Sequence, residues 1–169
     1  MQIFIIGYMY SGKSTTGKKL AKTLGFDFVD TDDLFEEKYR ISIPNFFEKY
    51  GEDLFREFEK NILFSLNNLQ NAVISTGGGT ACSEENISFI KKNGISVCLE
   101  PDIDTIMSRL QSSKKKRPTL DKIPKDKLQE FIEQQLNERN TFYKQANIIV
   151  PAKNVIIDDL KNRLGDFLH

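Results

Sequence analysis

Two kinds of hydrophobic pattern alternate along the chain. Short apolar runs, most of them rich in β-branched residues, predict buried strands at about residues 2–6, 26–30, 72–76, 95–99 and 147–150. Segments with apolar residues at helical spacing predict helices at about residues 15–24, 34–39, 41–50, 52–69, 84–92, 103–110, 125–143 and 155–168. Strands that alternate with helices are typical of a parallel sheet covered on both faces. The sequence therefore predicts an α/β fold with three α/β/α layers and a five-stranded parallel sheet.

One internal segment, residues 111–124, follows neither pattern. It carries five positive charges, four of them in the run from Lys114 to Arg117. Because the regular pattern resumes after it, the segment is predicted to be a mobile loop and not a linker between domains. A chain of 169 residues suits one domain with a sizeable core, so residues 1–169 are expected to form a single domain.

Composition argues against several classes of protein. Lys plus Arg equals Asp plus Glu at 24 each, which argues against a general nucleic-acid binder. No apolar run approaches the roughly 20 residues that span a membrane, and the first strand begins by residue 2, which leaves no room for a leader. Cys82 and Cys98 lack the spacing of metal ligands, which favours reduced thiols in a cytoplasmic protein. The one histidine, His169, is the last residue, so proton transfer is expected to depend on carboxylates.

The clearest chemical signal is the sequence Gly-Tyr-Met-Tyr-Ser-Gly-Lys-Ser at residues 7–14. It fits the phosphate-loop pattern, and it lies between a predicted strand and a predicted helix, as that pattern requires; the alternative is an ordinary turn with incidental glycines. Backbone N–H groups at the helix N-terminus favour a polyphosphate. Lys13 would neutralise the outer phosphates, and the Ser14 hydroxyl would ligate Mg²⁺. The predicted contacts to a nucleoside triphosphate are Tyr10, Ser11, Gly12, Lys13, Ser14 and Thr15.

Two other predicted strands end in residues with complementary chemistry. Asp30-Thr31-Asp32-Asp33 follows the second strand and Gly77-Gly78-Gly79 the third, at the sheet edge where α/β folds bind ligands. An isolated acidic triplet most often caps a helix. Beside a phosphate loop, one aspartate can hold Mg²⁺, and another, preferably Asp32, can orient or deprotonate an attacking hydroxyl. Three glycines can be a flexible turn, but after a buried strand they favour close approach of a ligand to the backbone.

Three arginines have both a structural and a functional interpretation. Arg56 and Arg139 lie in predicted helices among acidic residues, and on the residues alone the simpler interpretation is pairing on a solvated face, such as Arg56 with Glu59. The basic run that ends at Arg117 can be a solvated loop. Opposite a triphosphate it would instead close over the site and supply charge to the transition state, as an arginine finger does.

Taken in order, these motifs resemble the shikimate kinase family, a branch of the phosphate-loop proteins related to nucleoside-monophosphate kinases. The resemblance covers nearly the whole chain and thins after about residue 145. The motifs that carry it are Gly7–Gly17, Asp30-Thr31-Asp32, Phe55-Arg56-Glu57-Phe58-Glu59, Ser75–Gly79, Arg117-Pro118, and Glu138-Arg139 with Tyr143 four residues on. Each motif after the first is weak alone, but the ordered set is highly specific.

The resemblance implies a phosphate-loop NTPase fold with a mobile lid at about residues 111–124 and a shikimate-binding helical segment at about residues 32–61. It implies Mg²⁺-dependent transfer of the γ-phosphate of ATP to the 3-hydroxyl of shikimate by a cytoplasmic monomer. Nucleic acid and membrane are not expected as partners.

Residue roles follow from the same resemblance, motif by motif. The catalytic residues would be Asp32, Lys13 and Arg117. Arg117 would be the lid arginine on ATP, and Arg109 would lie near the adenine. Ser14 would ligate Mg²⁺, which Asp30 would support through water. Shikimate would contact Asp32, Arg56, Arg139 and the backbone of Gly77, Gly78 and Gly79, with Gly78 as the preferred donor.

The chain departs from the family pattern at two places. Tyr10 stands in the phosphate loop where the family usually has another glycine, and a side chain there is expected to alter loop geometry or nucleotide affinity. Pro151 and Ala152 fall where a loop beside the adenine is expected, so no nucleotide contact is assigned to them.

Other functions share part of this pattern. A gluconate kinase has the same fold and phosphate loop, and paired arginines suit any carboxylate. A nucleoside-monophosphate kinase would need a pocket for a second base, for which the sequence offers no candidate. A non-catalytic nucleotide-binding switch would need only Lys13 and Ser14, and it would leave Asp32, Arg56 and Arg139 without a role.

Overall fold

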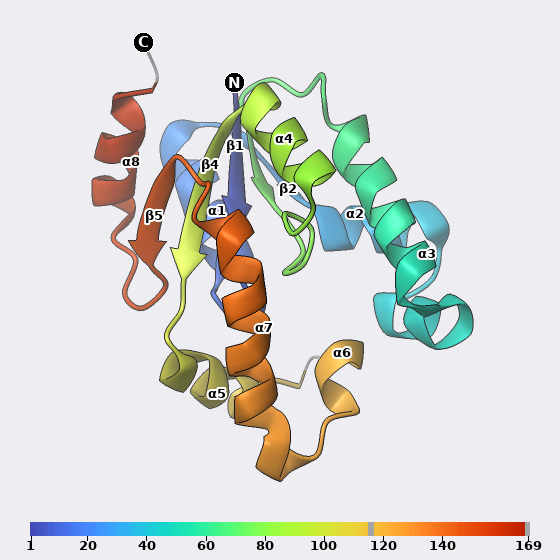
Figure 1. Cartoon of the computed structure of the whole chain (residues 1–169). Helices are drawn as coiled ribbons and strands as arrows, with labels where there is room; N and C mark the ends of the chain where they lie inside the picture. Colours follow the sequence, from blue (N-terminus) through green and yellow to red (C-terminus); the bar gives the residue numbers. More distant parts are fainter. Residues whose placement is uncertain (115–116, 168–169) are drawn as a thin grey trace.

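A computed structural model describes residues 1–114 and 117–167. Within these residues the strands form one five-stranded parallel sheet in the order β2-β3-β1-β4-β5 (Figure 1). Both ends of each strand lie within one residue of the predicted position, so the predicted fold class is confirmed. The strands are β1 (Gln2–Ile6), β2 (Asp27–Asp30), β3 (Ala72–Ser75), β4 (Ile95–Glu100) and β5 (Ile148–Pro151).

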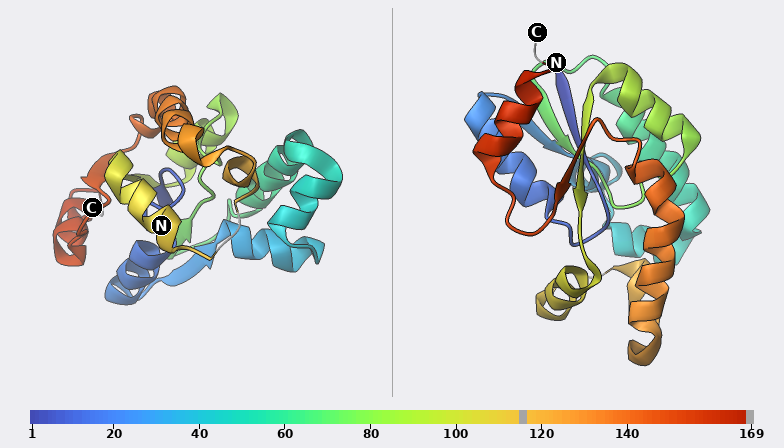
Figure 2. Two further views of the ribbon diagram at one scale, coloured as in Figure 1. Left: turned by 90° about the horizontal axis from the view of Figure 1, so that it is seen from below. Right: turned by 60° about the vertical axis from the view of Figure 1, so that its left-hand side comes forward.

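Helices cover both faces of the sheet, as the right-hand view of Figure 2 shows. Two of them, α1 and α8, pack on one face, and α3, α4 and α7 contribute to the core on the other. The helices are α1 (Lys13–Leu24), α2 (Thr31–Tyr39), α3 (Ile43–Ser65), α4 (Glu84–Asn93), α5 (Ile103–Ser112), α6 (Pro118–Asp121), α7 (Leu128–Tyr143) and α8 (Ile157–Gly165), and a 3-10 turn, η1 (Lys125–Lys127), precedes α7.

The central strand β1 divides its side chains between the two faces. Ile3 and Ile5 belong to the hydrophobic cluster under α1 and α8, whereas Phe4 and Ile6 belong to the cluster under α3, α4 and α7. All four side chains are fully buried. This is the burial expected of a parallel strand with helices on both sides, and it explains why the strand appears in the sequence as a continuous apolar run.

The segment formed by α2 and α3 has an aromatic core of its own. The Phe35 ring lies edge-on to Phe46, with 5.1 Å between ring centroids, and 5.0 Å from Phe55. The sequence predicts separate helices at 41–50 and 52–69, and the backbone does break between them, at Gly51, whose φ of 82° is not helical. The two halves of α3 therefore fold back over one shared group of rings.

The segment predicted to be a lid contains a short helix, α6, that the hydrophobic pattern does not predict. Leu120 of α6 is buried in the core, and the backbone N–H of Arg117 donates to the Asp121 carboxylate at 3.0 Å. Part of the basic run, residues 115–116, and the C-terminal His169 lie outside the described residues. Mobility of the lid stays a prediction.

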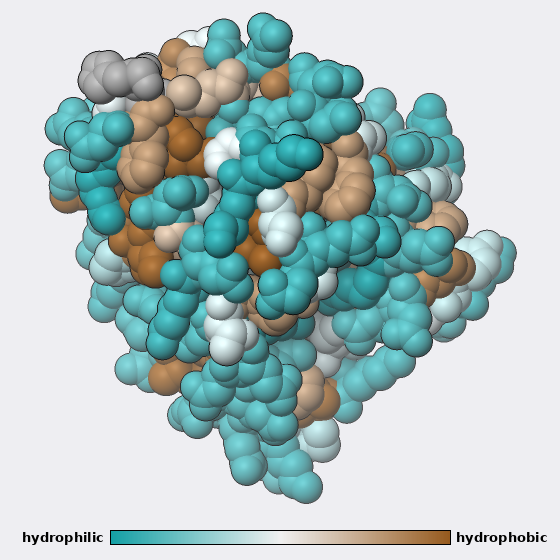
Figure 3. Space-filling model, turned by 45° about the horizontal axis from the view of Figure 1, so that its top comes forward, coloured by the Kyte–Doolittle hydropathy of each residue, from teal (hydrophilic) through white to brown (hydrophobic). Residues whose placement is uncertain are grey.

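The carboxyl ends of the strands gather with α5 and α6 at the end of the molecule opposite the N-terminus (Figure 1). The opposite side, turned forward in Figure 3, is largely hydrophilic, with small hydrophobic areas between polar side chains. None of the described helices is long and apolar enough to cross a membrane. The predicted phosphate loop, aspartates and glycines all lie at the carboxyl edge, which is where α/β sheets bind ligands.

Candidate active site

The phosphate loop connects β1 to α1 and needs glycine at both of its ends. A Cβ on Gly7 would lie 2.5 Å from the carbonyl oxygen of Leu99, so the loop passes too close to β4 for any side chain. Gly12 precedes α1 with φ 87°, a conformation that favours glycine. The first turn of α1 therefore directs its free N–H groups into a pocket of about 230 Å³, lined by this loop, Asp30, Asp32, Thr76, Gly77, Gly78 and Arg117.

Lys13 is buried at the base of this pocket. Its Nζ donates to the carbonyl oxygen of Tyr8 at 2.9 Å. Burial, together with the positive charge of Arg117, lowers the pKa of the Lys13 ammonium from 10.5 to about 8. The surroundings therefore destabilise the charged form of Lys13, and the negative charge of a bound polyphosphate would stabilise it.

Ser14 and Asp30 form a second, oxygen-rich part of the same pocket. The Ser14 hydroxyl donates to Asp30 Oδ2 at 2.5 Å and lies 3.3 Å from the Ser75 hydroxyl. Asp30 Oδ1 accepts from the backbone N–H of Asp32 at 3.0 Å, so this aspartate also caps α2. The helix-cap interpretation of Asp30 is therefore confirmed, and its role as a metal ligand stays a prediction.

These oxygens suit Mg²⁺ and not a softer metal. Mg²⁺ is commonly held by one or two protein oxygens together with water and substrate phosphates, and not by a cage of protein ligands. Ser14 and Asp30 are therefore the residues that fit a magnesium ion shared with a nucleotide.

Asp32 and Arg117 meet where the phosphate pocket adjoins a second pocket. Arg117 Nη1 lies 3.9 Å from Asp32 Oδ2, and both side chains are mostly buried. Both line the phosphate pocket and also the neighbouring pocket, whose other walls come from Ile43, Phe47, Phe55, Arg56, Gly77–Gly79 and Arg139. Asp32 and Arg117 therefore border both pockets.

Arg56 makes the helical ion pairs that its sequence predicts, and it also lines the second pocket. Its Nη1 donates to Glu59 at 2.9 Å and its Nη2 to Glu52 at 3.1 Å, so the expected helical pairing is present. Glu59 is buried, however, and its other oxygen accepts from the Thr80 hydroxyl at 2.7 Å, just after the three glycines. Burial alone would lower the pKa of Arg56, but the two glutamates raise it. The pairing therefore fixes a charged guanidinium at the wall of the second pocket.

Arg139 faces the same pocket from α7. Its guanidinium lies over the Tyr8 ring, 5.3 Å from the ring centroid. Its Nη1 is buried and has no hydrogen-bond partner within the described residues. A buried donor on a cation is costly unless something accepts from it. An anionic group in the second pocket would satisfy this nitrogen.

The three glycines after β3 make room for the protein's own side chains. A Cβ on Gly79 would lie 2.7 Å from both Nη atoms of Arg56, and one on Gly77 would lie 2.7 Å from Glu59 Oε1. Tyr143, at the end of α7, donates its hydroxyl to the carbonyl oxygen of Gly78 at 2.5 Å. The sequence predicts that these glycines admit a ligand. In the structure they also admit the carboxylate and guanidinium that line the pocket.

Arg109 connects the phosphate loop to the segment after β5. Its Nη1 donates to the carbonyl oxygen of Tyr10 at 2.8 Å, and its Nη2 to that of Ala152 at 3.2 Å. Arg109, Ala152 and the start of α1 therefore lie together, on the side of the phosphate loop away from the second pocket. The predicted role of Arg109 beside the adenine stays a prediction.

At the site the structure adds supporting contacts to those that the sequence predicts. Tyr8 supports Arg139, and Glu59 supports Arg56. The pairing of Arg56 with Glu59 was visible in their helical spacing, but Thr80 as a second partner of Glu59 was not. Nothing in the sequence links Tyr8 to Arg139, because their contact joins the phosphate loop to a helix near the other end of the chain.

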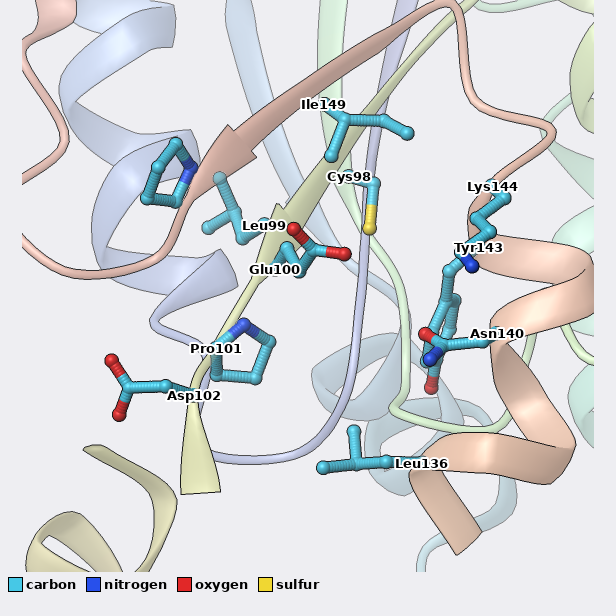
Figure 4. A pocket seen from close by; sticks show the side chains of 11 residues that line it. Cys98, Leu99, Glu100, Pro101, Asp102, Leu136, Asn140, Tyr143, Lys144 and Ile149 are labelled. Atoms are coloured by element: carbon cyan, nitrogen blue, oxygen red, sulfur yellow. The ribbon is translucent and has the colours of Figure 1, made fainter. Parts of the chain in front are cut away.

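A further pocket of about 400 Å³ lies between β4, β5 and α7 (Figure 4). Cys98, Glu100 and Asn140 project toward it, and none of its lining residues is a predicted site residue. Both cysteines are free thiols. Burial, together with the nearby Glu100 carboxylate, raises the pKa of Cys98 to about 12, so this thiol is not a nucleophile near neutral pH. This pocket therefore contains none of the residues to which the sequence assigns chemistry.

Comparison with known proteins points the same way. A family model for shikimate kinase matches residues 9–162. A curated shikimate kinase from Bacteroides fragilis is 41% identical over 152 residues, or 90% of this chain and 85% of that protein. The solved shikimate kinase from Bacteroides thetaiotaomicron superposes with a TM-score of 0.88 at 37% identity, covering 99% of this chain and 98% of that one. The enzyme from Acinetobacter baumannii, solved in complex with shikimate, has a TM-score of 0.87 at 30% identity, with 99% and 92% covered.

The environment of Lys13 makes a prediction about stability. Lys13→Met removes a buried charge, so the free energy of unfolding of the ligand-free protein at pH 7 should rise by about 1–3 kcal/mol, while nucleotide binding is lost. Between pH 8 and 10.5 the wild-type lysine is neutral when folded but still protonated when unfolded. Its destabilising effect should therefore fade as the pH rises through this window, and the difference from Lys13→Met should shrink. Denaturant unfolding at pH 7 and pH 9.5 measures both effects, and a variant less stable than wild type at pH 7 would contradict them.

Proposed function

The chain belongs to the shikimate kinase family, and we propose that it transfers the γ-phosphoryl group of Mg-ATP to the 3-hydroxyl of shikimate, giving shikimate 3-phosphate and ADP. The observation that carries this proposal is Arg139 Nη1, a buried donor without a partner within the described residues, in a pocket that adjoins the phosphate loop. The comparisons favour this acceptor over gluconate or a nucleoside monophosphate. They equally favour an enzyme over a nucleotide-binding switch.

We assign the triphosphate to the pocket at the start of α1. The N–H groups of the phosphate loop bind the phosphate oxygens, and Lys13 neutralises the outer phosphates. Ser14 and Asp30 hold Mg²⁺, Asp30 through water, and the ion when bound neutralises charge on the phosphates. Support for the last assignment comes from the 2.5 Å contact between Ser14 and Asp30, which already brings two oxygen ligands together.

We assign the carboxylate of shikimate to Arg56 and Arg139. Two guanidinium forks match a planar carboxylate, and each offers parallel N–H donors. Glu59 and Glu52 accept from Nη1, Nη2 and Nε of Arg56, so one N–H on each Nη remains for the ligand. The backbone at Gly77–Gly79 then lies along the ring of the substrate, and Gly78 has its carbonyl already occupied by Tyr143.

We propose that Asp32 acts on the attacking hydroxyl. Its carboxylate accepts a hydrogen bond from the 3-hydroxyl and orients that oxygen in line with the γ-phosphorus. The oxygen–phosphorus bond forms as the bond to the ADP oxygen breaks, and the hydroxyl proton leaves to Asp32 or to the transferred group. Because the transition state is loose, orientation contributes more than proton abstraction. Arg117, 3.9 Å from Asp32, supplies positive charge to the transferred oxygens.

We further propose that residues 1–169 act as one kinase domain and as a cytoplasmic monomer. In this assignment residues 32–61 bind the acceptor and residues 111–124 form the lid. The aromatic core between α2 and α3 supports the assignment of residues 32–61, since it lets that segment move as a unit. Arg117, at the junction of both pockets, supports the assignment of the lid.

The proposed function is tested by coupled ADP release with Mg-ATP and a panel of acceptors: shikimate, gluconate and the nucleoside monophosphates. Shikimate alone should stimulate ADP release. Stimulation by gluconate instead would show that the protein is a gluconate kinase. ATP binding without stimulation by any acceptor would favour the switch and overturn the proposal.

Asp32→Asn should lower kcat by about 10²–10⁴-fold, because the amide accepts the hydroxyl proton poorly and orients the oxygen less firmly. Affinity for ATP, measured by calorimetry, should change by less than about threefold, because Asp32 does not hold the phosphates. Asp33→Asn is the matched control, since Asp33 is exposed on the same helix turn. Equal kcat values for Asp32→Asn and wild type would rule out the assigned role.

Arg139→Gln should reduce kcat/KM for shikimate by about 100-fold, because one charged fork to the carboxylate is lost. The KM for ATP should stay nearly constant. Its neighbour Glu138 is exposed, and Glu138→Gln provides a control on the same helix turn. An Arg139→Gln defect expressed mainly in the KM for ATP would contradict the placement of the carboxylate.

Gly79→Ala should raise the KM for shikimate by about tenfold, because the added Cβ displaces the Arg56 guanidinium from the pocket wall. Gly165→Ala adds the same atom in open space at the end of α8 and is the control. Thermal unfolding of both variants checks that the fold is retained. A Gly79→Ala enzyme with wild-type KM would show that Arg56 can move without loss of substrate binding.

A further inference from the structure

Tyr10 adopts a backbone conformation that disfavours a large side chain. Its φ is 64°, in the left-handed region. Among the described residues, the other non-glycine residues with positive φ are Arg40, which ends α2, and two asparagines, Asn71 and Asn154. Asparagine tolerates this region far better than tyrosine does. A strained aromatic residue within a phosphate loop therefore calls for a compensating interaction of its side chain.

The compensating partner of the Tyr10 ring is Arg117. The guanidinium carbon of Arg117 lies 5.3 Å from the centroid of the ring, within the range of a cation–π interaction. The main chain of Tyr10 is held separately, because its carbonyl oxygen accepts from Arg109. The ring is thus directed at the guanidinium, while the backbone is fixed from the α5 side.

Electrostatics explains why Arg117 needs this support. Arg117 is close enough to Lys13 that its charge helps to lower the pKa of the lysine, so the two cations repel each other. The carboxylate of Asp32 lies 3.9 Å away, longer than a hydrogen bond. The Nε of Arg117 is buried and has no hydrogen-bond partner within the described residues. A ring face attracts the cation without using its N–H donors, which stay directed at the junction of the two pockets.

We propose that Tyr10 is a positioning residue for phosphoryl transfer: its ring holds the Arg117 guanidinium between the nucleotide and acceptor pockets. The inference rests on the proposed function. It assigns a role to the ring that the strained backbone of Tyr10 carries. Tyr8 acts in parallel two residues earlier, where its ring lies under Arg139. The phosphate loop therefore supplies both rings: Tyr8 lies under Arg139 of the acceptor pocket, and Tyr10 lies under Arg117 of the lid.

The test compares Tyr10→Leu with Tyr10→Phe. Both variants keep a large apolar side chain at the same strained φ, but only phenylalanine keeps a ring face. Tyr10→Leu should lower kcat about five- to tenfold, as expected for loss of a partly buried cation–π contact, and Tyr10→Phe should rescue most of that loss. The KM for shikimate should not change. Equal losses in both variants, or a defect confined to the KM for ATP, would overturn the proposal.

A double-mutant cycle separates positioning from general packing. In an Arg117→Ala background, which already lacks the guanidinium, Tyr10→Leu should change kcat by less than twofold. An undiminished five- to tenfold loss in that background would show that the ring acts on something other than Arg117, and would overturn the proposal.

The same cycle in thermal unfolding makes this inference independent of the acceptor. Without ligands, the Tm changes of Tyr10→Leu and Arg117→Ala should be non-additive if the ring contacts the guanidinium. Additive Tm changes would overturn the contact even in an enzyme that phosphorylates shikimate. Conversely, non-additive Tm changes in a protein that does not release ADP with shikimate would retain the contact and overturn the proposed function.

Discussion

The site gathers four cationic side chains at one edge of the sheet, and its remaining features serve to hold them there. Burial and mutual repulsion work against this arrangement, as the lowered pKa of Lys13 records. Each of the three arginines lies over an aromatic ring, 5.3 Å from its centroid: Arg56 over Phe55, Arg117 over Tyr10 and Arg139 over Tyr8. A ring face stabilises a cation and leaves its N–H groups available. The protein thus holds positive charge ready for two anionic ligands.

The acidic residues and glycines fit the same constraint. Glu59 is buried between Arg56 and Thr80, so it fixes the guanidinium at the wall of the second pocket. Glycine at position 79 leaves the space that this guanidinium fills. Asp32 stands beside the one arginine that borders both pockets. The carboxylates therefore balance part of the positive charge around the two pockets.

Local features were predictable from the sequence, whereas distant contacts were not. Strands β1, β3 and β4 are short apolar runs, as burial on both faces requires, and the phosphate loop is a contiguous motif. That an aspartate of residues 30–33 lies near the phosphate loop followed from two strand ends at one edge, and the resemblance named Asp30. The contact of Arg139 with Tyr8 joins positions far apart in the chain, and no local pattern encodes it. The short helix α6 spans only four residues, too few for a periodic signal, and Leu120 is buried through tertiary packing.

A crystal structure with Mg-ADP and shikimate would test directly whether these cations hold both ligands. We expect the shikimate carboxylate within hydrogen-bond distance of Arg56 and Arg139, its 3-hydroxyl on Asp32, and the β-phosphate on the phosphate loop beside Lys13. Arg117 should remain over the Tyr10 ring or move only toward the phosphates. A structure with the carboxylate away from both arginines, or with the 3-hydroxyl directed away from the nucleotide, would contradict the assigned site.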